Sequence, residues 1–271
     1  TDAGIIEHIL HVLDPKPGDV LVEIGPGQGA ITFPILKRHG SLTVIEFDRD
    51  LITPLSEAAH GIGDLTIVHK DVLQVDFDKL AGEDRIRLIG NLPYNISTPI
   101  LFHVLAHCRH VRDMHFMLQK EVVDRMAAGP GSKIYGRLSI MLQSVCEVIP
   151  LFDVPPYCFN PPPKVNSAVV CLIPRPAGEL GIRDQRMFEA VVRDAFSQRR
   201  KTLRNALAKQ CTADQLLAAG IKPEARAEQI PVEDFIRLSN SLHSAYARLF
   251  RTGYQSGAIM AVTENSGLTA Q

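Results

Sequence analysis

Residues 20–29 read Val-Leu-Val-Glu-Ile-Gly-Pro-Gly-Gln-Gly, an apolar run that passes into three closely spaced glycines. The segment from Val20 to Ile24 is typical of a strand that is buried in a parallel sheet. The glycines that follow let the backbone turn sharply and approach a ligand where a Cβ atom would be in the way. A helix is predicted next, over residues 30–38. This succession of strand, glycine loop and helix predicts a nucleotide-binding α/β fold.

The same alternation continues along the first half of the chain. Helices are predicted over residues 3–13 and near 50–59, and further strands over 42–46, 65–68, 86–90 and 114–119. Strands that alternate with helices at this spacing predict a doubly wound, Rossmann-like α/β sheet.

The second half of the chain changes character. Two closing strands are predicted over residues 146–152 and 167–173, and the prolines between them favour a stiff, extended backbone. Pro174-Arg175-Pro176 indicates a domain boundary, and the pattern from residue 185 onward is helical. We therefore predict a first domain over 1–176, a small helical domain over 177–252, and a loosely ordered tail over 253–271.

Polar residues at successive strand ends predict a nucleotide site. Gly25 and Gly27 form the turn, Glu46 ends the second strand, and Asp71 follows the third. A carboxylate at position 46 can accept hydrogen bonds from ribose hydroxyls, and Asp71 can accept one from an adenine amino group. The same spacing also satisfies the fingerprint of a nicotinamide cofactor. Glu23 favours S-adenosylmethionine instead, because a carboxylate near the loop would help to hold the methionine ammonium.

Asn91-Leu92-Pro93-Tyr94 follows the fourth predicted strand and predicts the reactive site. The lone pair of an adenine N6 is delocalised into the ring, so this nitrogen is a poor nucleophile. The side-chain oxygen of Asn91 and the carbonyl of Leu92 could accept both N6 hydrogens, while Tyr94 stacks on the base. The alternative is an ordinary strand-end turn, since Asn and Pro are common in turns.

Composition limits the class of protein. The chain is 45% apolar and 22% charged, and it has neither a run of eighteen apolar residues nor a secretory-signal pattern. We therefore expect no membrane span and a cytoplasmic location. Without any C-x-x-C pair, the cysteines are expected to be reduced thiols, at positions Cys108, Cys146, Cys158, Cys171 and Cys211. His8 and His11 share a predicted helix, but a packed or solvated face is the simpler interpretation, and no metal site is predicted.

The net charge of −1 conceals a local basic segment. Residues 193–209 hold six basic residues against Asp194, a net charge of +5. Arg199, Arg200, Lys201 and Arg204 are partly at helical spacing, and they predict phosphate contacts with RNA. A solvated helix face is the alternative interpretation.

Four segments together resemble the KsgA/RsmA-type small-subunit rRNA adenine dimethyltransferases. They are NLPYNISTP at 91–99, MHFMLQKEV at 114–122, FNPPPKVNSAVV at 159–170 and FSQRRKTLRNAL at 196–207, and the similarity covers nearly the whole chain. The resemblance implies a methyltransferase sheet with a small C-terminal helical domain. It also implies transfer of methyl groups from S-adenosyl-L-methionine to N6 of two adjacent adenosines near the 3′ end of small-subunit rRNA, during ribosome assembly.

The resemblance also implies roles for individual residues. Gly25, Glu46, Asp71 and Asn91 resemble the cofactor contacts of the family, and Asn91, Leu92 and Tyr94 match its reactive loop. Phe159 is implied as a second stacking face for the target base, and the alternative is a Phe buried in the core under a loop. Lys164 is a candidate phosphate contact, and the alternative is a solvated lysine. The family has a Gln-Asn-Phe-Leu segment before its first helix that lines the cofactor pocket. The present sequence begins after that point, at Thr1, and is expected to lack its natural start.

Three other functions remain open from the sequence. A related methyltransferase of large-subunit rRNA is the nearest, although residues 96–99 and 114–122 favour the small-subunit branch. A non-catalytic assembly or RNA-binding factor would keep the fold, but the intact Asn91 and Tyr94 argue against lost activity. A nicotinamide oxidoreductase lacks any accompanying set of residues for hydride transfer. A monomer that acts on rRNA is expected.

Overall fold

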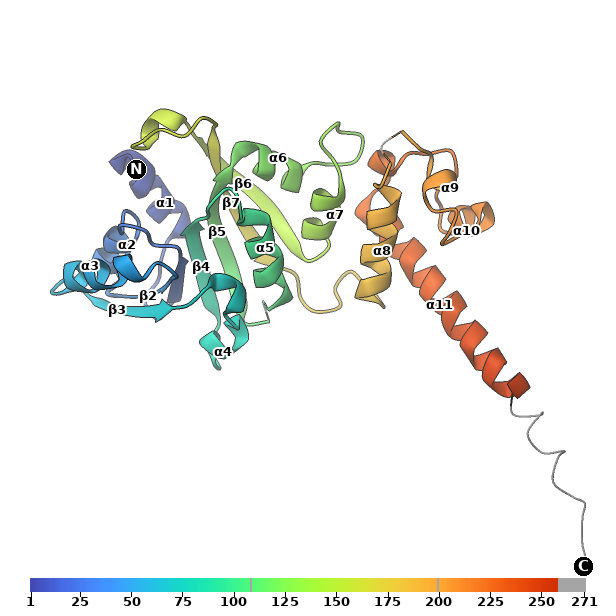
Figure 1. Cartoon of the computed structure of the whole chain (residues 1–271), viewed down its shortest axis with the longest axis horizontal. Coiled ribbons are helices and arrows are strands. Elements are labelled where there is room, and N and C mark those ends of the chain that lie inside the picture. Colours follow the sequence, from blue (N-terminus) through green and yellow to red (C-terminus); the bar gives the residue numbers. More distant parts are fainter. Residues whose placement is uncertain (108, 199, 258–271) are drawn as a thin grey trace, which may run out of the picture. The chain divides into compact units, whose positions relative to one another are not determined.

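The structure is a computed structural model that describes residues 1–107, 109–198 and 200–257 (Figure 1). The chain divides into two compact units, of which the first comprises Thr1–Ala128 and Met141–Pro176. The second comprises Gly129–Ile140 and the chain from Ala177 onward. The first unit ends at the predicted boundary, but residues 129–140 group with the helical unit and not with the sheet.

In the described part of the chain, seven strands form one sheet in the order β3-β2-β1-β4-β5-β7-β6. Their bounds are β1 (Val20–Ile24), β2 (Ser41–Glu46), β3 (Asp64–His69), β4 (Ile86–Asn91), β5 (Val111–Gln119), β6 (Cys146–Val154) and β7 (Ser167–Pro174). Strands β1 to β5 pair in parallel, whereas β7 runs antiparallel to β5 and β6. The predicted doubly wound sheet is confirmed. Its strand order reverses at β1, which is where open sheets of this kind bind ligands.

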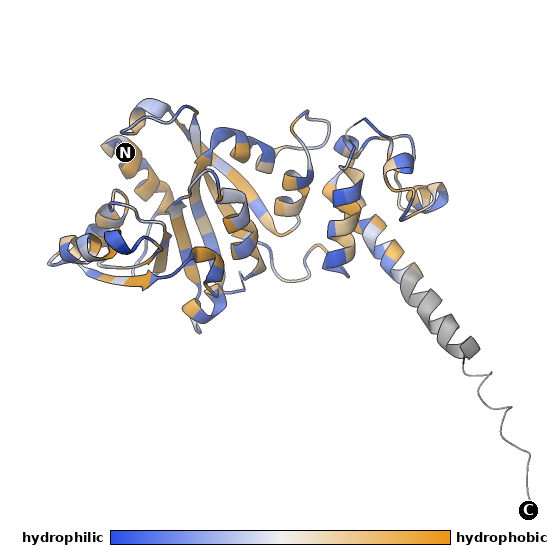
Figure 2. Ribbon diagram, viewed as in Figure 1, coloured by the Kyte–Doolittle hydropathy of each residue, from blue (hydrophilic) through white to orange (hydrophobic). Residues whose placement is uncertain are grey.

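Helices of the first unit cover the sheet and complete its core. They are α1 (Ala3–Leu13), α2 (Thr32–His39), α3 (Arg49–Ala59), α4 (Phe77–Ala81), α5 (Ser97–Ala106) and α6 (Lys120–Ala127). A single hydrophobic cluster joins side chains of α1, α2 and α3, such as Leu10 and Leu36, to strand residues such as Leu21 and Val44. Figure 2 shows these helices and strands with their hydrophobic residues in orange. The side chains of the candidate site project from the same face of the sheet as this cluster.

Local chemistry sets the ends of α1. The side chain of Asp2 caps its first turn, because Oδ1 accepts hydrogen bonds from the amides of Gly4 (2.8 Å) and Ile5 (3.2 Å). At the other end, the guanidinium of Arg87 in β4 donates to the carbonyl oxygen of Leu13 at 2.7 Å. The helix is thereby held to the sheet at its carboxyl end.

The proline-dense connection between β6 and β7 differs from its prediction. A 3-10 helix, η2 (Pro156–Cys158), interrupts the expected extended path. The amide of Cys158 donates to the carbonyl of Pro155, and that of Phe159 donates to Pro156, both at 3.1 Å. Prolines tolerate the start of a helical turn because their φ is already suitable and their missing N–H would be unpaired there.

The second unit is helical, as expected, with α8 (Gln185–Ala195), α9 (Leu203–Ala206), α10 (Ala213–Ala218), the 3-10 helix η3 (Ala227–Gln229) and α11 (Val232–Gly257). Another helix, α7 (Arg137–Gln143), begins in this unit. Phe188 and Phe235 are fully buried in it, and the hydroxyl of Tyr135 donates to the carbonyl of Ile230 at 2.7 Å. This hydrogen bond helps to explain why residues 129–140 belong here. Helix α11 runs past Thr252, where the sequence analysis ended this domain.

No helix within residues 1–107, 109–198 and 200–257 is long and apolar enough to cross a membrane.

Candidate active site at the carboxyl edge of the sheet

Three polar side chains lie at the carboxyl ends of their strands, on the face of the sheet that carries the core cluster. Side chains alternate between the two faces of a strand, so Glu23 shares a face with Leu21 of the core cluster. Glu46 continues β2 and Asn91 continues β4 in the same way. Because β2, β1 and β4 are adjacent and parallel, the three side chains lie at one edge. The structure thus brings together residues that the sequence assigned to cofactor binding and to reaction.

The backbone at this edge requires glycine in the loop after β1 and near the end of β4. Gly25 and Gly27 adopt positive φ values of 67° and 56°, which other residues rarely adopt. The amide of Gly25 donates to the carbonyl of Ile45 in β2 at 3.0 Å, which ties the loop to the neighbouring strand. A Cβ atom at Gly90 would lie 2.6 Å from the carbonyl oxygen of Ile24. Strand β4 can therefore approach β1 this closely only with glycine directly before Asn91.

Glu23 is a buried carboxyl, only 2% exposed. Burial raises its pKa to about 7, and the nearby charge of Glu46 acts in the same direction. The hydroxyl of Thr32, at the start of α2, donates to Oε2 at 2.6 Å and opposes that rise in the pKa. A nearby positive charge would favour the ionised form of such a group. The site therefore fits a ligand that carries a cation to the glycine loop, such as the ammonium and sulfonium of S-adenosylmethionine.

Glu46 and Asp71 each keep one carboxylate oxygen available to a ligand. Oε1 of Glu46 accepts a hydrogen bond from the amide of Asp48 at 2.7 Å, and Oδ1 of Asp71 accepts one from the amide of Leu73 at 2.9 Å. Their second oxygens accept no hydrogen bond among the described residues. Asp71 also caps the 3-10 helix η1 (Val72–Gln74), a structural role that the sequence analysis did not predict.

The reactive loop leaves β4 with its polar groups exposed. Asn91 is exposed, whereas the side chain of Leu92 is 1% exposed and anchors the loop in the core. The amide of Leu92 donates to the carbonyl of Met117 in β5 at 3.2 Å. The hydroxyl of Tyr94 is hydrogen-bonded to Oγ of Ser167, the first residue of β7, at 2.5 Å. The carbonyl of Tyr94 also accepts a hydrogen bond from Oγ of Ser97 at 3.4 Å, so Tyr94 is held at both its backbone and its ring.

Phe159 and Lys164 lie in the connection between β6 and β7. Phe159 is partly buried and packs against the hydrophobic core cluster, which is the structural alternative to a role in base stacking. Lys164 is exposed.

The predicted RNA-contacting basic residues belong to the second unit. Arg200, Lys201 and Arg204 are all exposed, and Arg199 lies outside the described residues. Arg200 and Lys201 occupy the turn between α8 and α9, so the predicted helical arrangement is wrong for them, and only Arg204 is helical. Helix α9 is short and begins only at Leu203. Before it, the amide of Lys201 donates to the carbonyl of Gln198 at 3.0 Å, which closes a turn in place of a helix.

Cysteines and histidines form no metal site in the described residues. Four of the five cysteines are described, as buried free thiols, and Cys108 lies outside the described residues. The imidazole of His8 stacks on Phe152, with ring centroids 3.9 Å apart. The packed interpretation of His8 therefore describes it better than a metal-ligand role.

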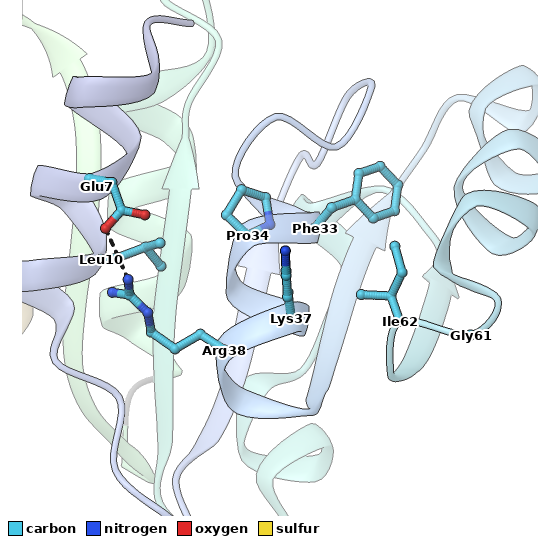
Figure 3. Close-up of a pocket in the computed structure, with 8 residues that line it drawn as sticks. All are labelled: Glu7, Leu10, Phe33, Pro34, Lys37, Arg38, Gly61 and Ile62. Carbon is cyan, nitrogen blue, oxygen red and sulfur yellow. Dashed lines mark hydrogen bonds and ion pairs between the residues drawn. The ribbon is translucent and has the colours of Figure 1, made fainter.

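A separate hollow of about 740 Å³ lies outside the candidate site (Figure 3). It is formed by α1, by α2 and by the loop before β3, and the residues around it are Glu7, Leu10, Phe33, Pro34, Lys37, Arg38, Gly61 and Ile62. An ion pair of 2.9 Å between Glu7 and Arg38 closes one side of it. The residues predicted to bind cofactor or substrate are absent from this set.

Sequence reasoning missed three residues at the site. Thr32 and Ser167 are 0% exposed, and they contact Glu23 and Tyr94 respectively. No local signal could identify Ser167, because 73 positions separate it from Tyr94. Phe47 is 72% exposed directly after Glu46, so it offers an aromatic face beside the predicted ribose acceptor. Its position next to a strand-end carboxylate was a usable signal.

Known proteins similar to this chain agree on one family. A family model described as ribosomal RNA adenine dimethylase matches residues 1–244. A curated protein named ribosomal RNA small subunit methyltransferase A, from Xanthomonas campestris pv. campestris (strain B100), is 65% identical over 239 residues. The match covers 88% of this chain and 91% of the relative. The protein of the same name from Xanthomonas oryzae pv. oryzae (strain PXO99A) is 64% identical over the same length.

Two solved structures resemble the fold of this chain. A dimethyladenosine transferase from Plasmodium falciparum matches with a TM-score of 0.75 and 27% identity, over 88% of this chain and 94% of that chain. The 23S rRNA methyltransferase ErmE matches with a TM-score of 0.69 and 23% identity, over 90% and 98% of the two chains, and shows the same fold. From the extent of the family match and the identity to these relatives, the chain belongs to the ribosomal RNA adenine dimethylase family.

Proposed function

We propose that this enzyme transfers methyl groups from S-adenosyl-L-methionine to N6 of two adjacent adenosines near the 3′ end of small-subunit rRNA. The product is N6,N6-dimethyladenosine, formed during ribosome biogenesis. Family membership supports the reaction class, and relatives named for the small subunit support the substrate. The observation that carries the proposal is the placement of the Asn91–Tyr94 loop at the same sheet edge as Glu23 and Glu46.

The cofactor is assigned to the first unit. The turn at Gly25 and Gly27 would admit its methionine half, Glu46 would accept its ribose hydroxyls, and Asp71 its adenine amino group. Asn91 stands between this site and the target base. The buried Glu23 favours a cationic ligand, since its pKa is raised to about 7 by burial. When bound, the sulfonium supplies an electrophilic methyl group.

Residues of the reactive loop would hold and activate the adenine. The side-chain oxygen of Asn91 and the carbonyl of Leu92 would accept the two N6 hydrogens, which favours a pyramidal nitrogen with an available lone pair. Pro93 has no N–H to compete for these acceptors. No strong base is needed, because the methylated amine loses its proton readily to water. Positioning and electrostatic stabilisation therefore supply most of the acceleration.

Stacking would hold the plane of the adenine. The ring of Tyr94, held by Ser167, provides one face for an unstacked base. Phe159 is proposed for the other face, with a small shift from its partly buried position. A second methylation requires only that one acceptor still bind the remaining N6 hydrogen while the other side admits the first methyl group.

The partner is rRNA within an assembling small subunit. Lys164 in the first unit and Arg200, Lys201 and Arg204 in the second are exposed cations suited to phosphate contact. Arg199 is proposed as a further contact from the sequence. We further propose that the first unit is the methyltransferase domain and that the helical second unit contacts RNA. We also propose that the protein is a monomer, that it uses no metal, and that it acts in the cytoplasm.

Incubation of the protein with labelled methyl donor and unmethylated small subunits tests the proposal directly. Digestion of the rRNA is expected to yield labelled N6,N6-dimethyladenosine with the native protein, and none with Asn91→Ala. Large subunits serve as the competing substrate, because a large-subunit methyltransferase would label those instead. Binding to small subunits without any methyl transfer would identify an assembly factor and contradict the enzymatic proposal.

A further inference from the structure

The connection between β6 and β7, residues 155–166, displays an aromatic side chain that the proposed chemistry does not use. Tyr157 is 83% exposed, the highest value for any large hydrophobic side chain in the described residues. The next residue, Cys158, is 8% exposed, and Phe159 packs against the core cluster. Cys158 and Phe159 thus face the interior of the protein, whereas Tyr157 before them faces solvent.

Backbone contacts hold Tyr157 in place. The amides of Cys158 and Phe159 bond to the carbonyls of Pro155 and Pro156, as described above. The carbonyl of Cys158 also accepts a hydrogen bond from the amide of Asp2 at 2.7 Å. The two prolines restrict the backbone on the other side. A partner that stacks on this ring would therefore gain the contact with little loss of backbone conformational entropy.

The connection lies at the reactive edge of the sheet. It ends at Ser167, which is bonded to Tyr94, and the carbonyl of Asn166 accepts a hydrogen bond from the amide of Lys120 at 2.9 Å. Lys120 directly follows the carboxyl end of β5. In Figure 1 the connection is the yellow-green segment beside the N-terminal end of α1. An RNA held in the reactive loop would extend along this edge.

The exposed groups of the connection match single-stranded RNA. Residues 155–166 include no acidic residue. Besides the Tyr157 ring, the exposed side chains include the amides of Asn160 and Asn166 and the ammonium of Lys164. Aromatic rings stack on bases, amides pair with base edges, and an ammonium neutralises phosphate.

We propose that Tyr157 is a stacking platform for an unpaired nucleotide in the rRNA segment that carries the target adenosines. The inference rests on the proposed function, which supplies the rRNA substrate. A base that is methylated on its amino nitrogen must leave its stack, so a flanking nucleotide loses a stacking partner. The ring of Tyr157 replaces that partner without contacting the reacting atoms.

Kinetics with unmethylated small subunits test the role of the ring. Tyr157→Ala is expected to raise KM about five- to ten-fold, the low end of one base–aromatic stack, while kcat stays unchanged. Flanking contacts bind ground state and transition state equally, which explains the effect on KM alone. Tyr157→Phe keeps the ring and should behave as wild type. Ile62→Ala, which removes a 42% exposed side chain from the loop before β3, away from the candidate site, is the control.

Two further measurements identify the partner. The Tyr157→Ala loss should be the same at every salt concentration, whereas Lys164→Ala should reduce the dependence of RNA affinity on salt. Ultraviolet cross-linking of wild-type complexes should join Tyr157 to a nucleotide of the target segment.

Three results would overturn the inference. They are a KM for Tyr157→Ala equal to that of Ile62→Ala, an equal loss in Tyr157→Phe, or cross-links only to ribosomal protein or to rRNA outside the segment. Failure of the proposed function would look different, because wild type itself would then yield no dimethyladenosine.

Discussion

Glu23 shows how one buried group can make this protein sensitive to pH. The group is 2% exposed, and burial raises its pKa to about 7. In the unfolded chain it titrates near its ordinary value of 4.5. Between these two values the folded state holds a proton that the unfolded state has lost, so folding stability falls as pH rises. Below 4.5 and above about 7 the contribution no longer changes.

We predict that Glu23→Gln flattens this part of the stability profile. Without cofactor, the unfolding free energy of the wild type should decrease between pH 4.5 and 7 by on the order of 3 kcal/mol at most. The variant should lack this decrease, because its amide does not titrate. Urea unfolding at a series of pH values measures the effect. Glu57→Gln, at an exposed position on α3, is the control. Equal pH slopes for wild type and Glu23→Gln would contradict the assignment.

The hydrogen bond between Tyr94 and Ser167 makes a second prediction at this scale. Ser167→Ala should lower kcat about five- to thirty-fold, because a lost hydrogen bond of 1–2 kcal/mol leaves the stacking ring less well oriented. KM for the small subunit should not change. Tyr94→Phe should have a similar effect, and the double variant should be no worse than either single variant.

Ser144→Ala is the control for this pair. Ser144 is also buried, but its hydroxyl bonds within its own turn, to the carbonyl of Met141 at 2.8 Å. Additive losses in the Ser167→Ala, Tyr94→Phe double variant would show that the two side chains act independently.

At the scale of the elements, a buried ion network joins α1 to the sheet. Arg87 in β4 has a side chain only 6% exposed, and it bonds Asp113 of β5 and Asp19 before β1, each at 2.9 Å. It also donates to the last carbonyl of α1, on Leu13. These contacts lie toward the amino ends of the strands, away from Asn91. The network therefore stabilises the framework and leaves the reactive edge free for ligands.

Removing the central cation should be costly. Arg87→Met is expected to reduce the free energy of unfolding by about 3–5 kcal/mol, because two largely buried carboxylates would lose their partner. Arg112→Met should cost less than about 1 kcal/mol, since that side chain contacts the same carboxylates but is 45% exposed. Urea unfolding at pH 7 compares them. Equal losses would show that burial is not what makes Arg87 important.

At the scale of the whole molecule, charge is distributed unevenly on a chain of net charge −1. Part of the basic segment is neutralised internally, because Arg193 pairs with Asp194 at 2.8 Å. Arg200, Lys201 and Arg204 remain exposed on the second unit. A near-neutral protein can therefore still present cations to phosphate.

Charge reversal at Arg200 and Lys201 tests whether these side chains contact phosphate or are only solvated. Arg200→Glu with Lys201→Glu should weaken binding to small subunits and lower the salt slope of log affinity by about 1–2, as expected for one or two phosphate contacts. Lys79→Glu with Arg85→Glu makes the same charge change on the first unit, before the amino end of β4, and should leave the slope unaltered. Filter binding over a salt series provides the measurement. Identical slopes for both double variants would contradict RNA contact at 200 and 201.

Much of the fold followed from local pattern. The bounds predicted for α1 and β1 match the structure, and the other strands of the sheet differ by a few residues at their ends. The helical spacing expected of Arg200 and Lys201 was wrong, because a turn bonded to Gln198 separates α8 from α9. The extended path expected after Pro155 was wrong for Pro156–Cys158, which form η2. In both places a short hydrogen-bonded turn, which leaves little periodicity in a sequence, decided the backbone.

The sequence by itself determined the succession of strands along the chain, the helices α1, α2 and α3, the glycine loop, and the placement of Glu46 and Asn91 at strand ends. These features are local, because side-chain alternation and glycine conformations act within a few residues. Only the tertiary structure decided that Ser167 holds Tyr94 across 73 positions, that Thr32 and burial set the pKa of Glu23, and that Tyr157 faces solvent. Burial and hydrogen bonding of this kind depend on which distant segments pack together, and a single sequence does not contain that information in its local pattern.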